Sequence, residues 1–239
     1  MQFVKIVSLS VVTMVLAGAV ARAEDNASIS GKVAFEGDAP KARKLKMDAD
    51  PQCAAMHSEK TPVSEEVIIN SNGTLKNVFV YVKSGVTGTY EPPKTPVTID
   101  QHGCTYQPHV FGMQVKQLLL IKNSDDTLHN IHALPTANKE FNKGQPAGST
   151  ELKTTFTQRD IMVKFKCDVH PWMTAYVGVL EHPFFAVTGD DGTFSIKGLP
   201  AGDYEVEAWH EKFGTQTAKV KVGAGEAKTA DFKFAKSAE

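Results

Sequence analysis

Three side chains that bind soft metal ions lie within seven residues of one another. Cys167, His170 and Met173 follow Phe165 with the spacing C-x2-H-x2-M. Thiolate, thioether and imidazole ligands suit copper, and a trigonal site of two histidines and one cysteine with a weak axial methionine is an electron-transfer arrangement. The stretch therefore predicts one type 1 copper ion per chain, provided that a second histidine comes from elsewhere.

The second histidine is expected from the segment Thr127 to His132, which contains His129 and His132. In a strand, alternate side chains point to opposite faces, so His129 shares a face with Ile131, and His132 lies on the other face. With Ile131 in the core, His129 is the expected ligand. Asn130 is a candidate for a hydrogen bond to the backbone of the cysteine-bearing loop, which would hold the ligands in place; as an ordinary strand residue it would face solvent.

The neighbours of His170 predict which part of the site is exposed to solvent and to partner proteins. His170 is expected to bind metal through one ring nitrogen and to turn its far edge to solvent. Pro171 and Trp172 would then form an apolar docking patch, suited to the small interfaces of transient redox encounters. In the alternative, Trp172 packs inward. Met173 has a similar alternative, as a core residue that closes the end of the barrel and does not bind metal.

Two further cysteines, Cys53 and Cys104, remain if Cys167 binds metal. An odd cysteine count in an oxidising compartment suggests one free thiol, which leaves the other two to form a disulfide. The competing interpretation is a second metal site on those cysteines with nearby histidines: His57, His102 and His109. The irregular spacing of these residues favours the disulfide.

The N-terminus predicts export. Residues 1–23 contain Lys5, an apolar run and the sequence Ala21-Arg22-Ala23, which together are typical of a cleaved signal peptide. The run is too short for a stable membrane span, so we expect a periplasmic or secreted protein with no membrane span after cleavage. A formal net charge of −1 gives no basic excess for binding nucleic acid.

The rest of the chain predicts an all-β fold. Short alternating apolar runs are separated by Gly, Pro and Asn turns, and Asn72-Gly73 predicts a hairpin over 67–83. The boundaries that follow are a first strand and loop in 24–65, a copper sandwich in 66–182 and a second sandwich in 183–239. Because the second sandwich is short of strands, we expect the first strand to join it, with the copper unit inserted between them.

The motifs resemble two known families. The His129-Asn130 pair, together with the loop from Cys167 to Met173, resembles the cupredoxins, with the short loop spacing of amicyanin. Thr188 to Phe234, with its D-G-T-F and L-P-A-G-D-Y motifs, together with Ala27 to Phe35, resembles the carboxypeptidase regulatory-like domain, a transthyretin-like β-sandwich.

The cupredoxin resemblance implies a non-enzymatic carrier of single electrons. Its expected partner is a redox protein such as a c-type cytochrome or a periplasmic oxidoreductase. The main alternative is copper storage, delivery or resistance without redox cycling. An enzyme is disfavoured because the chain lacks the repeated H-x-H pairs of copper oxidases and nitrite reductases.

Overall fold

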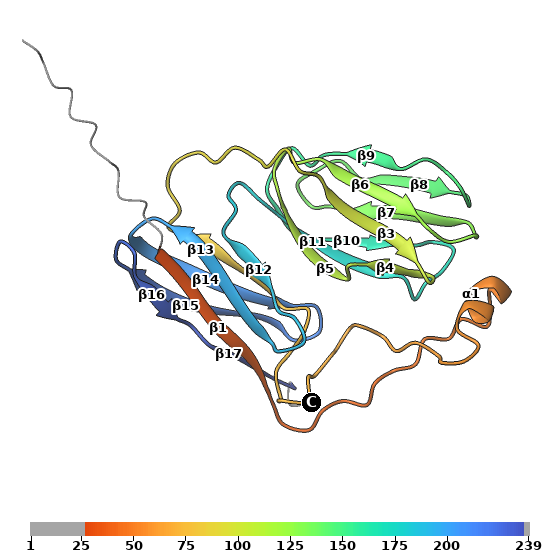
Figure 1. The fold of residues 1–239 in the computed structure, drawn as a ribbon, viewed down its shortest axis with the longest axis horizontal. Coiled ribbons are helices and arrows are strands. Elements are labelled where there is room, and N and C mark those ends of the chain that lie inside the picture. Colours follow the sequence, from red (N-terminus) through yellow and green to blue (C-terminus); the bar gives the residue numbers. More distant parts are fainter. Residues whose placement is uncertain (1–26, 237–239) are drawn as a thin grey trace, which may run out of the picture.

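A computed structural model describes residues 27–236 of the chain. The predicted signal peptide, 1–23, lies outside these residues. The described part is almost entirely β, as predicted, and its one α-helix, α1 (Pro51–Met56), is a short element in the long connection that follows the first strand (Figure 1). Among the residues described, no helix has the length and apolar character needed to cross a membrane.

The two ends of the chain build one β-sandwich, which we call the flanking sandwich. Its strands are β1 (Ala27–Glu36), β2 (Phe79–Ser84), β12 (Phe185–Val187), β13 (Thr193–Leu199), β14 (Gly202–His210), β15 (Gly214–Val222), β16 (Ala227–Thr229) and β17 (Phe232–Ala235). One sheet has the order β13-β1-β16 with β17 also paired to β1, and the other has the order β12-β2-β14-β15. The first strand thus lies at the centre of a sheet whose other members come from the C-terminal quarter.

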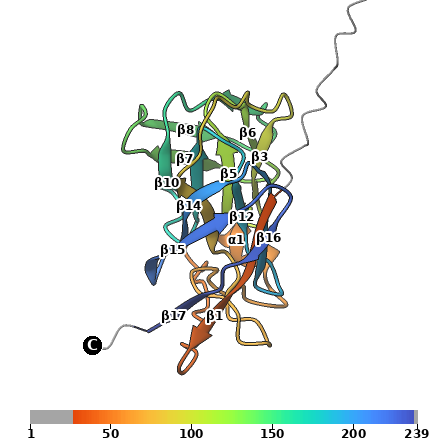
Figure 2. The ribbon, with the colours of Figure 1, turned by 90° about the vertical axis from the view of Figure 1, so that its left-hand side faces the viewer.

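The middle of the chain builds a second body, the inserted sandwich (Figures 1 and 2). Its strands are β3 (Val97–His102), β4 (Thr105–Gln107), β5 (Val110–Gln114), β6 (Leu119–Asn123), β7 (His129–Leu134), β8 (Phe141–Gln145), β9 (Leu152–Thr154), β10 (Asp160–Lys166) and β11 (Thr174–Leu180). The sheets have the orders β4-β3-β6-β9 and β5-β11-β10-β7-β8. The apolar core between them includes Cys167 and Met173.

The boundary predicted for the copper unit, 66–182, is wrong at its N-terminal side. β2 pairs with β12 and β14, so it belongs to the flanking sandwich. The physical reason is that β2 is buried on both faces. Val80 and Val82 pack into the flanking core, whereas Phe79 and Tyr81 pack against the inserted sandwich. The inserted sandwich therefore begins at β3.

The contact between the sandwiches is close-packed. The Phe79 ring fills the space above Gly178, where an added Cβ would come within 2.3 Å of the ring. Beside this apolar contact, His109 of the inserted sandwich forms an ion pair with Glu211 of the flanking sandwich. Both side chains are largely buried, so the ion pair joins the two bodies at a site shielded from solvent.

This ion pair predicts a pH-dependent stability. Burial lowers the pKa of His109, but Glu211 outweighs burial and raises the pKa above its ordinary value of 6.5. A raised pKa means that the stabilisation is fully present below 6.5 and is lost as the pH rises through the folded-state pKa. We expect Glu211→Gln to cost ~2 kcal/mol of unfolding free energy just below pH 6.5 and much less at high pH. Denaturant unfolding of both proteins across this range measures it; parallel pH profiles would contradict it.

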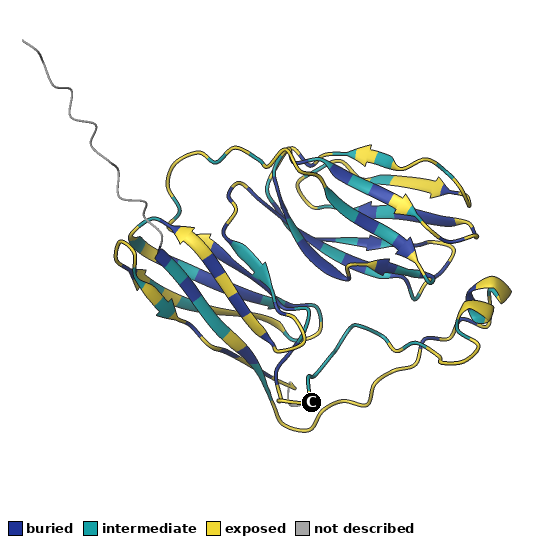
Figure 3. Ribbon diagram, viewed as in Figure 1, coloured by how far each residue is buried: buried dark blue, intermediate teal, exposed yellow. Residues whose placement is uncertain are grey.

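A third feature lies between β1 and β2. Residues 41–60, which we call the cap segment, leave the flanking sandwich, run along the inserted sandwich and contain α1 (Figure 1). The segment is mostly exposed (Figure 3), but Leu45, Met47 and Cys53 are buried against the inserted sandwich. A disulfide joins Cys53 to Cys104, with a sequence separation of 51. The predicted disulfide thus anchors the cap segment to the inserted sandwich.

Candidate metal centre

Two imidazoles and one thiol converge at one end of the inserted sandwich. The Nδ1 atoms of His129 and His170 lie 2.9 Å apart, and the Cys167 Sγ lies 3.7 Å from the His170 Nδ1. Ligand atoms of all three residues lie within 4.8 Å of one another. All three side chains are buried, with residue exposures of 0–2%. The structure therefore brings together three of the four predicted ligands with their donor atoms facing one another.

Neighbouring strands of one sheet position these residues. His129 begins β7, and Cys167 directly follows β10, which pairs with β7. The loop after β10 returns into β11 and is closed by its own backbone. The Cys167 N–H donates to the Met173 carbonyl at 3.2 Å, and the Met173 N–H donates to the His170 carbonyl at 2.9 Å. The short loop thus fixes the backbone on which both of its predicted ligands stand.

Asn130 holds this loop from β7. Its Oδ1 accepts the Asp168 N–H at 2.7 Å and lies 3.2 Å from the Cys167 Sγ. Its own N–H points at the same sulfur, 3.5 Å away, and the His170 N–H does so at 3.4 Å. Two backbone N–H groups thus point at the sulfur and favour a thiolate, whereas the thiol form of Cys167 donates its S–H to Asn130 Oδ1.

The electrostatics of the site favour a thiolate at Cys167. Burial raises the pKa of this thiol, but hydrogen bonds from His129 and from the backbone N–H groups of Asn130 and His170 outweigh burial and lower the pKa below its ordinary value. The thiolate is the form that binds metal. The hydrogen bonds that lower the pKa of Cys167 therefore favour the form that binds metal.

Asp125 orients the ring of His129. Its Oδ2 lies 2.9 Å from the His129 Nε2, and the Gly103 and Cys104 N–H groups both donate to the same carboxylate at 2.7 Å. Burial lowers the pKa of His129, but Asp125 and Cys167 outweigh burial and raise the pKa to about 9. A carboxylate on the outer nitrogen fixes the tautomer that leaves Nδ1 for a metal.

His170 differs from the sequence prediction. Its far edge was expected to face solvent, but the residue is only 1% exposed. Its Nε2 lies 2.9 Å from Asp50 Oδ2 and 3.7 Å from Cys53 Sγ, both in the cap segment. The hydrogen bond to His170 lowers the pKa of Asp50. The prediction is wrong because the cap segment, which the sequence places in a loop within 24–65, crosses the end of the site.

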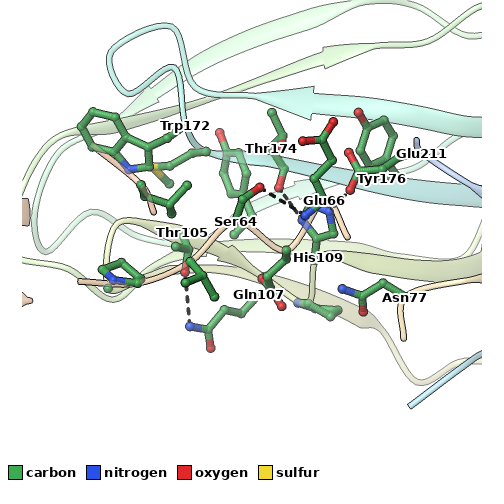
Figure 4. A pocket seen from close by; sticks show the side chains of 18 of the residues that line it. Ser64, Glu66, Asn77, Thr105, Gln107, His109, Trp172, Thr174, Tyr176 and Glu211 are labelled. Atoms are coloured by element: carbon green, nitrogen blue, oxygen red, sulfur yellow. Dashed lines mark hydrogen bonds and ion pairs between the residues drawn. The ribbon is translucent and has the colours of Figure 1, made fainter. Parts of the chain in front are cut away.

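Trp172 both packs inward and lines an open groove, so each of its two predicted positions is partly realised. Its ring lies 5.0 Å from the His170 ring and its Nε1 donates to the Cys104 carbonyl, so it packs inward under the cap segment. Its other side lines a groove with a volume of about 1040 Å3, between the two sandwiches and the cap segment. Figure 4 shows Trp172 at one end of this groove and His109 with Glu211 at the other. Pro171 is exposed beside it.

The remaining candidates occupy distinct places. Met173 is buried in the same cluster as Cys167, consistent with either of its two predicted roles. His132 lies outside the site, where its ring bonds Asp168 at 3.0 Å and Glu140 at 2.7 Å. Cys53 and Cys104 are consumed by the disulfide and so are not thiolate ligands in this structure.

The donor set fits a copper ion. Metal–nitrogen distances near 2.0 Å and metal–sulfur distances near 2.3 Å place nitrogen and sulfur of a trigonal site about 3.7 Å apart, which matches Cys167 Sγ and His170 Nδ1. The 2.9 Å between the two Nδ1 atoms is a hydrogen-bond distance. Two nitrogens of a trigonal site lie about 3.5 Å apart, so the rings of His129 and His170 must separate by about half an ångström to admit a metal between them.

Two functional residues were missed from the sequence, the carboxylates on the outer nitrogens of the imidazoles. Asp125 lies four residues before His129, in the connection between β6 and β7. The rule that ligand histidines donate their second N–H to a carboxylate could have found it. Asp50 carried no local signal, because its relation to His170 depends on the path of the cap segment.

Comparison with protein families gives one match. The model of the carboxypeptidase regulatory-like domain matches residues 173–235. This range covers the C-terminal strands of the flanking sandwich but also β11, which lies in the inserted sandwich, and it omits β1 and β2. Comparison with curated protein sequences found no match.

Solved structures with similar folds include copper proteins. A Cu-containing nitrite reductase from Thermus scotoductus SA-01 is 20% identical, with a TM-score of 0.34; the match covers 41% of this chain and 26% of that one. A purple cupredoxin from Nitrosopumilus maritimus is 22% identical, with a TM-score of 0.30, covering 35% and 98%. A variant of amicyanin in its Cu(I) form is 18% identical, with a TM-score of 0.31, covering 42% and 97%. The carboxypeptidase regulatory-like domain and the cupredoxins, which the sequence motifs resemble, are thus both among the matches.

Proposed function

We propose that this chain is a type 1 copper protein that carries single electrons between redox partners in the periplasm or outside the cell. The observation that carries the proposal is the buried convergence of two Nδ1 atoms and a thiol whose pKa is lowered. Copper bound there would supply a one-electron couple. His129, Cys167 and His170 would hold the ion, and Met173 would be the weak axial ligand.

The chain's own contribution is a prearranged, dry site. Asp125 and Asp50 hold the two imidazoles from their outer nitrogens, and Asn130 holds the loop at Asp168. Ligands that are held by such hydrogen bonds change little in geometry when one electron is gained or lost. The burial of all three donors keeps water away from the metal. The expected partner is a one-electron redox protein such as a c-type cytochrome or a periplasmic oxidoreductase.

One observation favours a second function, copper storage or delivery without redox cycling. The cap segment covers the imidazole edge of His170, so that edge is not available for docking.

Repeated reduction and oxidation of the copper-loaded protein distinguishes the two functions. A carrier should lose its visible colour on mild reduction and regain it on oxidation with no loss of copper. Loss of the metal within a few cycles, or failure of the colour to return, would favour storage.

The carboxylate on His129 gives a specific prediction. We expect Asp125→Asn to weaken Cu(II) binding by about 10–100-fold, the usual cost of losing an outer partner of a ligand histidine. The neighbouring residue Asp126 is exposed, so Asp126→Asn is the matched control and should bind copper like the unaltered chain. Competition titration against a chelator measures both affinities. Equal affinities for the two variants would contradict the role of Asp125.

A further inference from the structure

The His170 ring has no free nitrogen edge. Its Nδ1 faces His129 and Cys167, and its Nε2 is bonded to Asp50. The Sγ of Cys53 lies against the same nitrogen at 3.7 Å. Both Asp50 and Cys53 lie in the cap segment, which precedes the inserted sandwich by some distance in the chain. A residue from outside that sandwich therefore contacts one of its predicted ligands.

Asp50 is itself held in place. It is the N-cap of α1, and its Oδ1 accepts the backbone N–H groups of Gln52 at 2.8 Å and Cys53 at 3.1 Å. Its other oxygen, Oδ2, is thereby left to accept from His170. The carboxylate thus links the first turn of α1 to the metal centre.

The disulfide connects the two carboxylates that serve the imidazoles. Cys53 donates its N–H to Asp50, and Cys104 donates its N–H to Asp125. Since Asp125 holds His129 just as Asp50 holds His170, each imidazole is oriented by a carboxylate bonded to one half-cystine. The arrangement joins the cap segment and the inserted sandwich at the position of the predicted ligands.

We propose that Asp50 is a positioning residue of the metal centre and that the disulfide-anchored cap segment shields the imidazole edge of His170 from solvent and from redox partners. This inference rests on the proposed function for the identity of the metal. A carboxylate that accepts the Nε2–H of His170 fixes the tautomer whose Nδ1 is free to bind. Redox partners must then exchange electrons at another part of the surface.

The shielding can be tested on metal-free protein with diethyl pyrocarbonate, which modifies accessible imidazole nitrogens. Mass spectrometry of the peptides should show slow modification of His170 and fast modification of His102, whose side chain is 62% exposed. Asp50→Ala should expose His170 and raise its modification rate at least about tenfold. Asp50→Asn, which keeps an oxygen acceptor, should remain protected, and so should the control Asp48→Asn, at an exposed residue of the same segment.

Two outcomes of that experiment would overturn the proposal: modification of His170 as fast as His102 in the unaltered chain, or full protection in Asp50→Ala. Protection that depends on Asp50 in a protein that forms no coloured copper site would instead overturn the proposed function and leave the role of the cap segment intact. The two failures are therefore distinguishable.

Measurements on copper-loaded protein can separate the effect of the negative charge of Asp50 from the effect of its hydrogen bond to His170. An anion beside His170 stabilises Cu(II) more than Cu(I), so Asp50→Asn should raise the reduction potential while the visible spectrum is retained. Asp50→Ala should also weaken Cu(II) binding, by about 10–100-fold. Asp48→Asn should change neither property. Identical potentials for Asp50→Asn and Asp48→Asn would contradict a role for the carboxylate at the centre.

Discussion

The variant Cys167→Ser should bind Cu(II) without any intense visible colour. The colour of the proposed site arises from charge transfer between thiolate and Cu(II), and Cys167 is the only free cysteine among the described residues. Because a serine hydroxyl remains protonated in the same pocket, the affinity for copper should fall by more than the ~10–100-fold that an outer partner contributes. Absorption spectra and chelator competition on the same samples measure both effects.

Two controls accompany this variant. Met173→Leu should keep the colour, because a weak axial ligand tunes the reduction potential and supplies little of the affinity. His132→Ala should also keep it, since His132 bonds Asp168 and Glu140 outside the site. Colour that survived in Cys167→Ser, or that vanished in His132→Ala, would show that the ligand set is misassigned.

Removing the disulfide should have the largest effect on stability. The double variant Cys53→Ser with Cys104→Ser opens a loop with a sequence separation of 51. Chain-entropy arguments put the loss at about 4 kcal/mol of unfolding free energy. Unfolding in denaturant, compared with the unaltered chain, measures the loss. Diethyl pyrocarbonate labelling of the same variant should show His170 exposed, because the cap segment is no longer anchored.

The double variant has a matched comparison in the unaltered chain treated with a dithiol reductant. Reduction converts the disulfide to two thiols while the dithiol becomes a cyclic disulfide, so no residue is replaced. Both samples should lose stability and protection of His170 together. A double variant that unfolds at the denaturant concentration of the disulfide-bonded chain would contradict the anchoring role of Cys53 and Cys104.

Much of the site followed from local sequence patterns. The spacing of Cys167, His170 and Met173 defines a loop, and strand alternation selected His129 over His132, in agreement with their positions in the structure. Such patterns succeed where the chemistry depends on residues close in sequence or on one strand. The assignment of β1 to the C-terminal sandwich followed from counting strands, and β1 does pair with β13, β16 and β17.

Features set by distant contacts did not follow from the sequence. The Asn72-Gly73 turn forms, but the predicted hairpin is reduced to a single bridge between Ile69 and Leu75. The strand after it, β2, pairs with β12 and β14 instead, because burial on both faces outweighs pairing with the adjacent segment.

A local irregularity in β10 interrupts the alternation of side chains between the two faces of the strand. Strict alternation along β10 would place Ile161 on the same face as Val163 and Phe165. Met162 has a positive φ of 59°, and the pairing of β10 with β11 shifts between Asp160 and Val163. Ile161 therefore packs in the contact between the sandwiches, whereas Val163 and Phe165 lie in the core. A bulge of this kind changes which face a residue occupies without changing the composition of the strand.

The central claim is tested most directly by the visible spectrum of the unaltered protein with added Cu(II), with metal analysis on the same sample. The arrangement of His129, Cys167 and His170 predicts one copper per chain and an intense thiolate-to-Cu(II) band. A protein that binds one equivalent of Cu(II) and stays colourless would contradict the assignment of these residues as a type 1 copper site.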